Sequence, residues 1–108
     1  MSYEHITLEE IDGFAAVTMR RARRRNSLSE EHLRELLDAF QNIAEGDARG
    51  VILAAEGPVF SSGHDFNDMH DRNLDEMKQL LGICGDLMQL LQRIPQPVIA
   101  QVEGLATA

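Results

Sequence analysis

The sequence lacks several features that would place it in a specialised class. Only one of its 108 residues is a cysteine, Cys84, so no disulfide can form within the chain, which suits a reducing compartment. No apolar run is long enough to span a membrane. Residues 1–5 contain neither the basic nor the apolar stretch of a signal peptide. Together these absences favour a cytoplasmic protein without a membrane span.

Positive charge is also scarce. Lys and Arg number 10 against 18 Asp and Glu, which gives a formal net charge of -8 at pH 7. Because nucleic-acid-binding domains present basic surfaces, this balance argues against nucleic acid as a partner. The apolar fraction of 44% is ordinary for a globular protein, and neither a repeat nor a low-complexity linker divides the chain. The sequence predicts a single small unit with a modest core.

Hydrophobic periodicity predicts an α/β arrangement. The segments with a strand pattern are 5–11, 14–20, 51–55 and 98–102. Asp12-Gly13 is a two-residue hairpin signal between the first two segments. The last two segments are short, apolar and unbroken, as in parallel strands covered on both faces, and they alternate with helical patterns. We therefore expect a parallel layer with right-handed crossovers.

Two long amphipathic helices are predicted. The first would be capped by Ser29, or by Ser27, whose spacing to Glu30 matches a capping box, and it would end near Gly46. Its apolar stripe comprises Leu33, Leu36, Leu37, Phe40, Ile43 and Ala44. The second would run from about Leu74 to Arg93. Its stripe comprises Leu74, Met77, Leu80, Leu81, Cys84, Leu87, Met88 and Leu91.

The segment Phe60-Ser61-Ser62-Gly63-His64-Asp65-Phe66 joins a buried strand to a helix start. A Gly in this position lets the backbone turn sharply, and the N–H groups after it point outward at a helix N-terminus. Such groups can hold a negatively charged oxygen, as in an oxyanion hole. A second donor would come from the turn at 104–108, because ligands gather beyond the carboxyl ends of parallel strands. The alternative is a tight turn with a surface His64.

Residues 20–25 contain five arginines, half of all Lys and Arg in the chain. Such a run can be a solvated loop, a nuclear-localisation signal or a nucleic-acid patch. With a net charge of -8, we favour a small phosphate-bearing ligand, which arginine forks bind well.

Other polar residues give weaker signals. His64, Asp65, Asp68, His70 and Asp71 do not have the spacing of a familiar metal site or catalytic dyad, so we expect no metal there. Cys84 lies on an apolar helix face, which indicates inert core. His5 and His32 are expected to be ordinary surface residues.

Three segments together resemble the crotonase superfamily, the enoyl-CoA hydratase/isomerase group. Residues 25–29 are similar to the family segment R-N-A-L-S, residues 60–66 to F-S-A-G-x-D-L, and residues 95–104 to P-x-P-V-I-A-x-V-x-G. The order and spacing also match, and the resemblance covers nearly the whole chain. Residues 1–108 would then be the N-terminal part of a crotonase-like domain. One departure is Ala22, where the family usually has a Pro.

The resemblance implies an α/β fold of ββα repeats, here apparently truncated to an open sheet with two long helices. It implies an acyl-CoA thioester-binding enzyme that stabilises a thioester enolate, with the backbone N–H of His64 as one oxyanion donor. The residues that would line the thioester and its coenzyme A are Arg23, Arg25, Ser27, Leu28, Ser62, Gly63, His64, Asp65 and Phe66. No separate cofactor is implied, since coenzyme A is part of the substrate. A complete domain would form a trimer-based homo-oligomer.

Alternatives follow from what the resemblance places elsewhere. The family's second oxyanion donor would come directly after Ala108, and the acid/base carboxylates of hydratases would come later still. A truncated, non-catalytic acyl-CoA-binding or interaction module is therefore a second hypothesis. A third is an unrelated small α/β domain whose arginines bind phosphate or nucleic acid.

Overall fold

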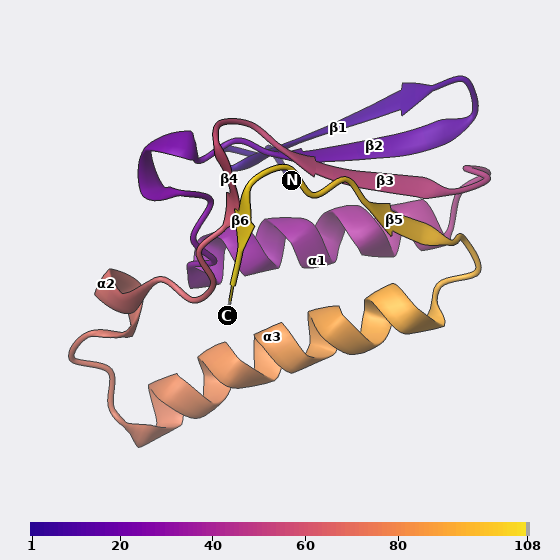
Figure 1. The fold of residues 1–108 in the computed structure, drawn as a ribbon. Coiled ribbons are helices and arrows are strands. Elements are labelled where there is room, and N and C mark those ends of the chain that lie inside the picture. Colours follow the sequence, from indigo (N-terminus) through magenta and orange to yellow (C-terminus); the bar gives the residue numbers. More distant parts are fainter. Residues whose placement is uncertain (108) are drawn as a thin grey trace.

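In the computed structural model, which describes residues 1–107, a four-stranded sheet has both long helices on the same side (Figure 1). Ala108, where the resemblance starts a Gly-rich segment, lies outside the described residues. The strands are β1 (Ile6–Ile11), β2 (Phe14–Met19), β3 (Val51–Ala55) and β5 (Val98–Ala100), in the order β1-β2-β3-β5. The pair β1–β2 is antiparallel, and β2, β3 and β5 run parallel. The predicted α/β class and its open sheet are confirmed.

The hairpin β1–β2 forms at the predicted turn. Asp12 and Gly13 both have positive φ, 52° and 85°, as a two-residue turn of the mirror-image type requires. The register places Ile11 opposite Phe14, so that Ala15, Val17 and Met19 all point into the core. The polar residues of β1 consequently face solvent.

Helix α1 (Glu30–Ala44) begins at Ser29, whose hydroxyl accepts a hydrogen bond from the His32 N–H. The predicted capping box from Ser27 is wrong, because the Ser27 hydroxyl donates to Asp65 instead. Residues three and four apart bury one face of the helix. Its buried apolar side chains are Leu33, Leu36, Ala39, Phe40 and Ile43.

Helix α3 (Leu74–Arg93) has the predicted bounds, and Asn73 and Glu76 form a capping box at its start. The predicted apolar stripe is too wide. Leu74, Leu81 and Met88 are exposed, while the unpredicted Ile83 is buried with Leu80 and Leu87. The physical reason is that α3 packs mainly on α1, and one neighbouring helix covers only a narrow seam. No described helix is long and apolar enough to cross a membrane.

The predicted strand at 98–102 is shorter and more exposed than expected. Its ladder with β3 ends at Ala100, and Ile99 is 63% exposed. Within the described residues β5 is an edge strand, so neither its outer side nor one of its faces is covered. The same lack of cover leaves most of β3 half-buried, with only Val51 fully enclosed.

A second, two-stranded sheet was not predicted. It pairs β4 (Val59–Ser61) with β6 (Leu105–Ala106) in parallel. Gly104 permits this pairing: its φ is 80°, and a Cβ there would overlap the Pro58 carbonyl oxygen. Two short helical turns complete the fold, η1 (Ala22–Arg24) and α2 (Phe66–Met69).

We expect Gly104→Ala to detach β6 from β4, because left-handed backbone costs an L-residue roughly 1–2 kcal/mol and the Pro58 carbonyl blocks the Cβ. Hydrogen exchange should show loss of protection at the Thr107 N–H, which donates to the Ser61 carbonyl. The matched control is Gly82→Ala, where a Cβ meets nothing within 4 Å in α3. It should keep that protection and stabilise the chain by up to about 1 kcal/mol. Equal protection in both variants would contradict the assignment.

Candidate functional site

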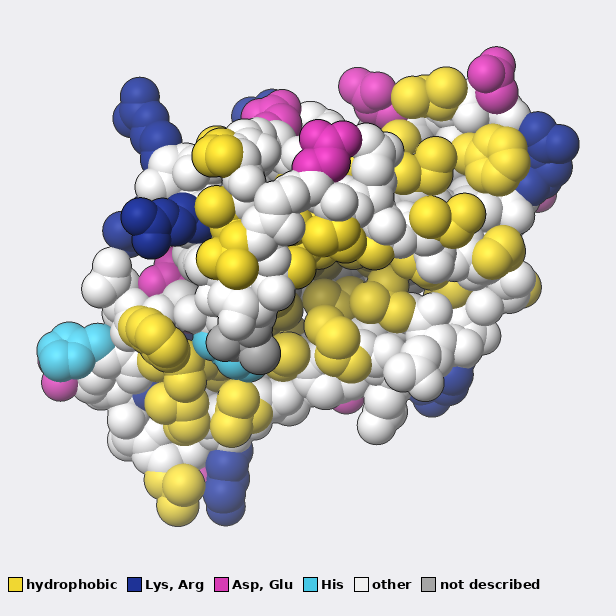
Figure 2. Space-filling view, in the orientation of Figure 1, with side chains coloured by type: hydrophobic (Ala, Val, Ile, Leu, Met, Phe, Trp, Pro, Cys, Tyr) yellow, Lys and Arg dark blue, Asp and Glu magenta, His cyan; other side chains and the backbone are white. Residues whose placement is uncertain are grey.

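An open cleft of about 500 Å³ lies between the arginine-rich turn and the loop that follows β4. Its lining residues are Arg23, Arg24, Arg25, Ser27, Ser62, His64, Asp65, Phe66 and Asn67. It therefore gathers all the predicted ligand residues except Leu28 and Gly63. These two are joined behind it by a hydrogen bond of 2.8 Å from the Leu28 N–H to the Gly63 carbonyl. Figure 2 shows basic side chains projecting from one edge of this face.

The arginine-rich turn is held by Asn26, which is fully buried. Its side-chain N–H₂ donates to the carbonyls of Glu56 and Val59, both at 2.9 Å, and its Oδ1 accepts from the Arg21 N–H at 2.8 Å. Arg25 and Asn26 both have positive φ, which asparagine tolerates better than most residues. Asn26 belongs to the segment 25–29 that resembles the family, but the sequence analysis assigned it no role. The available signal was its amide, which can satisfy several backbone groups at once in a tight turn.

The loop at 62–65 uses three of its four backbone N–H groups inside the protein. Their acceptors are the Arg25 carbonyl, the Ser61 hydroxyl and the Leu28 carbonyl. The remaining N–H, that of His64, has no acceptor among the described residues. Leu28 and His64 form a parallel bridge, in which the neighbours of His64 bond to Leu28 and its own N–H points away from that strand. Gly63 makes this turn with φ at 87°.

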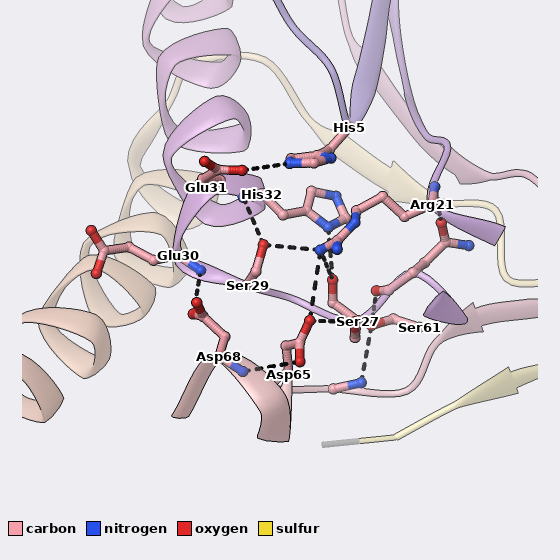
Figure 3. A network of polar contacts seen from close by, with 12 residues as sticks. His5, Arg21, Ser27, Ser29, Glu30, Glu31, His32, Ser61, Asp65 and Asp68 are labelled. Atoms are coloured by element: carbon pink, nitrogen blue, oxygen red, sulfur yellow. Dashed lines mark hydrogen bonds and ion pairs between the residues drawn. The ribbon is translucent and has the colours of Figure 1, made fainter. Parts of the chain in front are cut away.

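Asp65 has a buried carboxylate that is turned into the protein (Figure 3). One oxygen accepts from the Ser27 hydroxyl at 3.1 Å and lies 3.8 Å from the Arg21 guanidinium. The other accepts from the Asp68 N–H and caps α2. Burial alone would raise the pKa of Asp65, but the hydrogen bonds from Asp68 and Ser27 and the charge of Arg21 lower it overall. The carboxylate is therefore ionised at neutral pH, and both of its oxygens already have partners within the protein.

The arginines of the turn divide into two groups. Arg21 is half-buried and donates to the Ser29 hydroxyl at 2.9 Å. Arg23, Arg24 and Arg25 are exposed on the cleft, and no carboxylate of the described residues lies within ion-pair distance of them. These three side chains therefore give one end of the cleft a positive potential in an acidic protein.

The His64 side chain is half-buried and turned toward α3. Its Nε2 lies 3.9 Å from the Cys84 sulfur, and its Nδ1 is buried with no partner among the described residues. Burial raises the pKa of the Cys84 thiol, which keeps it protonated. Cys84 thus packs partly against the core, as predicted, and partly against the cleft loop.

His32 is fully buried, so its prediction as a surface residue is wrong. Its Nδ1 lies 3.0 Å from the Ser27 carbonyl and must donate to it, and burial lowers the pKa of His32 to about 4. His5 is half-buried beside Glu31. Among the described residues, the one His/Cys/Asp/Glu group close enough to share an ion is Glu4, His5 and Glu31.

The turn at Gly104 comes close to the cleft loop. Strand β6 lies beside β4, and the Thr107 N–H donates to the Ser61 carbonyl at 3.0 Å. The turn at Gly104 and the strand β4 are therefore adjacent, next to the loop where the sequence predicts a ligand site.

Comparison with known proteins gives one consistent family. The model of the family described as enoyl-CoA hydratase/isomerase matches residues 9–108. Mouse enoyl-CoA hydratase domain-containing protein 3, mitochondrial, is 39% identical over 90% of this chain. Methylmalonyl-CoA decarboxylase from Escherichia coli is 27% identical over 96% of the chain. The crystal structure of human enoyl coenzyme A hydratase domain-containing protein 3 superposes with a TM-score of 0.92 and 34% identity over 97% of the chain.

The chain spans only part of these relatives. It covers 33% of the mouse protein, 40% of the decarboxylase and 42% of the human crystal structure. The similarity therefore concerns the described sheet, both long helices and the cleft between the arginine-rich turn and the loop after β4.

We expect Asn26→Ala to destabilise the chain by about 3 kcal/mol or more, because it leaves buried backbone groups of Arg21, Glu56 and Val59 without partners. Urea unfolding followed by circular dichroism measures this. The control is Asn67→Ala, an exposed residue on the rim of the cleft, which should change stability by less than about 0.5 kcal/mol. Similar losses in both variants would show that Asn26 does not hold the turn.

Proposed function

Because the chain belongs to the enoyl-CoA hydratase/isomerase family, we propose that its cleft binds an acyl-CoA thioester. In this proposal the His64 backbone N–H donates a hydrogen bond to the thioester carbonyl oxygen. The observation that carries it is the hydrogen-bond accounting of loop 62–65, in which only the His64 N–H lacks an acceptor among the described residues. A preformed donor beside an open cleft is available to a ligand at no cost to the fold.

The proposed chemistry places negative charge on that carbonyl oxygen. Removing a proton next to a thioester, or adding a nucleophile to an enoyl thioester, moves an electron pair toward the oxygen and forms an enolate. A fixed N–H donor stabilises this charge more than it stabilises the neutral carbonyl, which is the requirement for catalysis. The bonds of Leu28 to Gly63 and Asp65 hold the loop, so the donor does not have to be ordered when the ligand binds.

The arginines support the same ligand at its other end. Arg23, Arg24 and Arg25 have no carboxylate partners among the described residues, and guanidinium groups pair well with phosphate oxygens. Coenzyme A carries several phosphates at the end remote from the thioester. The proposed pose therefore lays the nucleotide along the turn and the thioester against His64.

Binding without turnover is a second candidate, and one observation favours it. The one carboxylate lining the cleft within the described residues is Asp65, which is ionised and fully engaged by Ser27, Asp68 and Arg21. It cannot donate a proton at neutral pH, so the described residues offer no evident acid/base pair. Hydration of an enoyl-CoA above the uncatalysed rate by the 108-residue chain would exclude this second candidate.

Titration calorimetry with a non-reactive acyl-CoA analogue tests the role of His64. We expect His64→Pro, which removes the backbone N–H, to weaken binding about tenfold, the value of one hydrogen bond. His64→Ala is the matched control, because it removes the imidazole and keeps the N–H, and it should bind like the wild type. Weaker binding in both variants would assign the contact to the side chain. Absence of binding by the folded wild type would overturn the proposal for this chain.

The arginines are tested with ligands that differ only in their phosphates. Arg23→Gln should weaken binding of the acyl-CoA analogue about three- to tenfold at low salt, and less at high salt. The same change should leave binding of the corresponding acyl-pantetheine, which has no phosphate, unaltered. Arg93→Gln, at the exposed end of α3, should affect neither ligand. An equal loss for both ligands would place Arg23 at another part of the ligand.

A further inference from the structure

The direction of the His64 N–H depends on how the chain is held before and after this residue. The Gly63 carbonyl and the His64 N–H belong to one planar trans peptide unit, so they point in opposite directions. The Leu28 N–H donates to that carbonyl at 2.8 Å, which aims the His64 N–H away from residue 28. This hydrogen bond fixes the side of the donor that precedes His64.

On the side that follows His64, the backbone is held less firmly. The Asp65 N–H donates to the Leu28 carbonyl at 3.4 Å, which is longer than most backbone hydrogen bonds. A hydrogen bond of this length restrains the loop only weakly. The Asp65 side chain is in position to supply a second anchor.

The Asp65 carboxylate is fixed by groups from three segments (Figure 3). Its Oδ2 accepts from the Ser27 hydroxyl at 3.1 Å and lies 3.8 Å from the Arg21 guanidinium. Its Oδ1 accepts from the Asp68 N–H at 3.2 Å, and the residue is only 7% exposed. Because hydrogen bonds to an ionised acceptor are stronger than those between neutral groups, this side chain has little freedom to move.

Arg21 connects this anchor to α1. Its guanidinium donates to the Ser29 hydroxyl at 2.9 Å and to the Ser27 carbonyl at 3.4 Å. Ser29 is the N-cap of α1, so the Asp65 carboxylate is linked to a long helix through two side chains. The backbone N–H of Arg21 also donates to the buried Asn26. The anchor therefore rests on ordered parts of the fold.

We propose that Asp65 is a positioning residue, which through Ser27 and Arg21 holds the His64 N–H in the direction of the ligand's carbonyl oxygen. This inference rests on the proposed function, in which that N–H binds the thioester. Both Asp65 oxygens are engaged inside the protein, so the effect of Asp65 reaches the ligand through His64. Because a hydrogen bond weakens steeply when it is misaligned, this anchor favours ligands that carry a carbonyl oxygen at the thioester position.

Two ligands that differ only in this oxygen test the proposal: butanoyl-CoA and its thioether, S-butyl-CoA. Calorimetric titration of the wild-type chain should show about tenfold tighter binding of butanoyl-CoA, the value of one hydrogen bond. Asp65→Asn should reduce this preference by about threefold or more, since the variant loses the charge beside Arg21 and the acceptor of Ser27. An asparagine still caps α2. A loss of stability alone would weaken both ligands alike and leave their ratio unchanged.

The carbonyl stretch of bound butanoyl-CoA, isotope-labelled at the carbonyl carbon, gives a second readout by infrared spectroscopy. It should lie at lower wavenumber on the wild-type chain than in solution, because a hydrogen bond to the oxygen weakens the C=O bond. In Asp65→Asn it should return part of the way. Ser27→Ala removes one donor to Asp65 and should move both readouts in the same direction by a smaller amount.

The matched control is Asp68→Asn, which removes the same charge three residues away. The Asp68 carboxylate accepts from the Glu30 N–H at 2.9 Å and pairs with Arg72 at 3.1 Å. None of its bonds within the described residues reaches the loop at 62–65. This variant should keep the wild-type preference for butanoyl-CoA.

The outcomes separate the positioning role from the proposed function. Equal binding of both ligands by the wild type, or no binding of either, would overturn both. A full preference retained in Asp65→Asn would overturn the positioning role alone, as would an equal loss of preference in Asp68→Asn. If Asp65→Asn does not fold, a full preference retained in Ser27→Ala has the same meaning.

Discussion

The cleft depends on one buried amide. The Asn26 side chain joins the arginine-rich turn to the two residues that bracket the start of β4, and the Ser61 hydroxyl donates to the Asn26 carbonyl at 2.9 Å. The turn is therefore held both by hydrogen bonds within it and by the strand that precedes the loop. Because both walls of the cleft share this support, the backbone that bears the exposed arginines keeps a fixed relation to the His64 N–H. Hydrogen bonds that are buried and fully paired supply this order in a region with little apolar packing.

Hydrogen bonds on two sides stabilise residues 27–29, the segment between the cleft and α1. The Ser27 hydroxyl donates to the ionised Asp65, while its carbonyl accepts from the neutral His32. Charge is thus concentrated on the cleft side of the segment, and a neutral ring lies behind it. Ser29, two residues on, caps α1 and also accepts from Arg21. Ser27 and Ser29 thus each bond to two different partners, Ser27 through its hydroxyl and its carbonyl and Ser29 through its hydroxyl, and these bonds help to order a turn rich in charged residues.

Much of the fold could be predicted from local signals, and the failures share a cause. The Asp12-Gly13 hairpin, the parallel β3 and the bounds of α3 all follow from features that act within a few residues. The pairing of β4 with β6 could not be predicted, because strands of two or three residues show no periodicity. The role of Asn26 depends on the distant carbonyls of Glu56 and Val59, which a sequence does not locate. The burial of His32 depends on the tertiary packing around the first turn of α1, which the local pattern does not reveal either. The resemblance of three sequence segments to a family identified most residues of the cleft. Which N–H of the loop lacks an acceptor could be seen only in the three-dimensional structure.

The bridge between Leu28 and His64 has a consequence for ligand selection. It joins the turn that bears the arginines directly to the loop that bears the free N–H, with no hinge between them. Under the proposed binding mode the backbone of the two cleft walls keeps a constant separation. Neither wall can slide relative to the other without breaking both hydrogen bonds of the bridge. A ligand that engages both ends would be selected by the span between its phosphate and its carbonyl oxygen. Acyl carriers with a shorter or longer arm would reach only one end and forfeit the other.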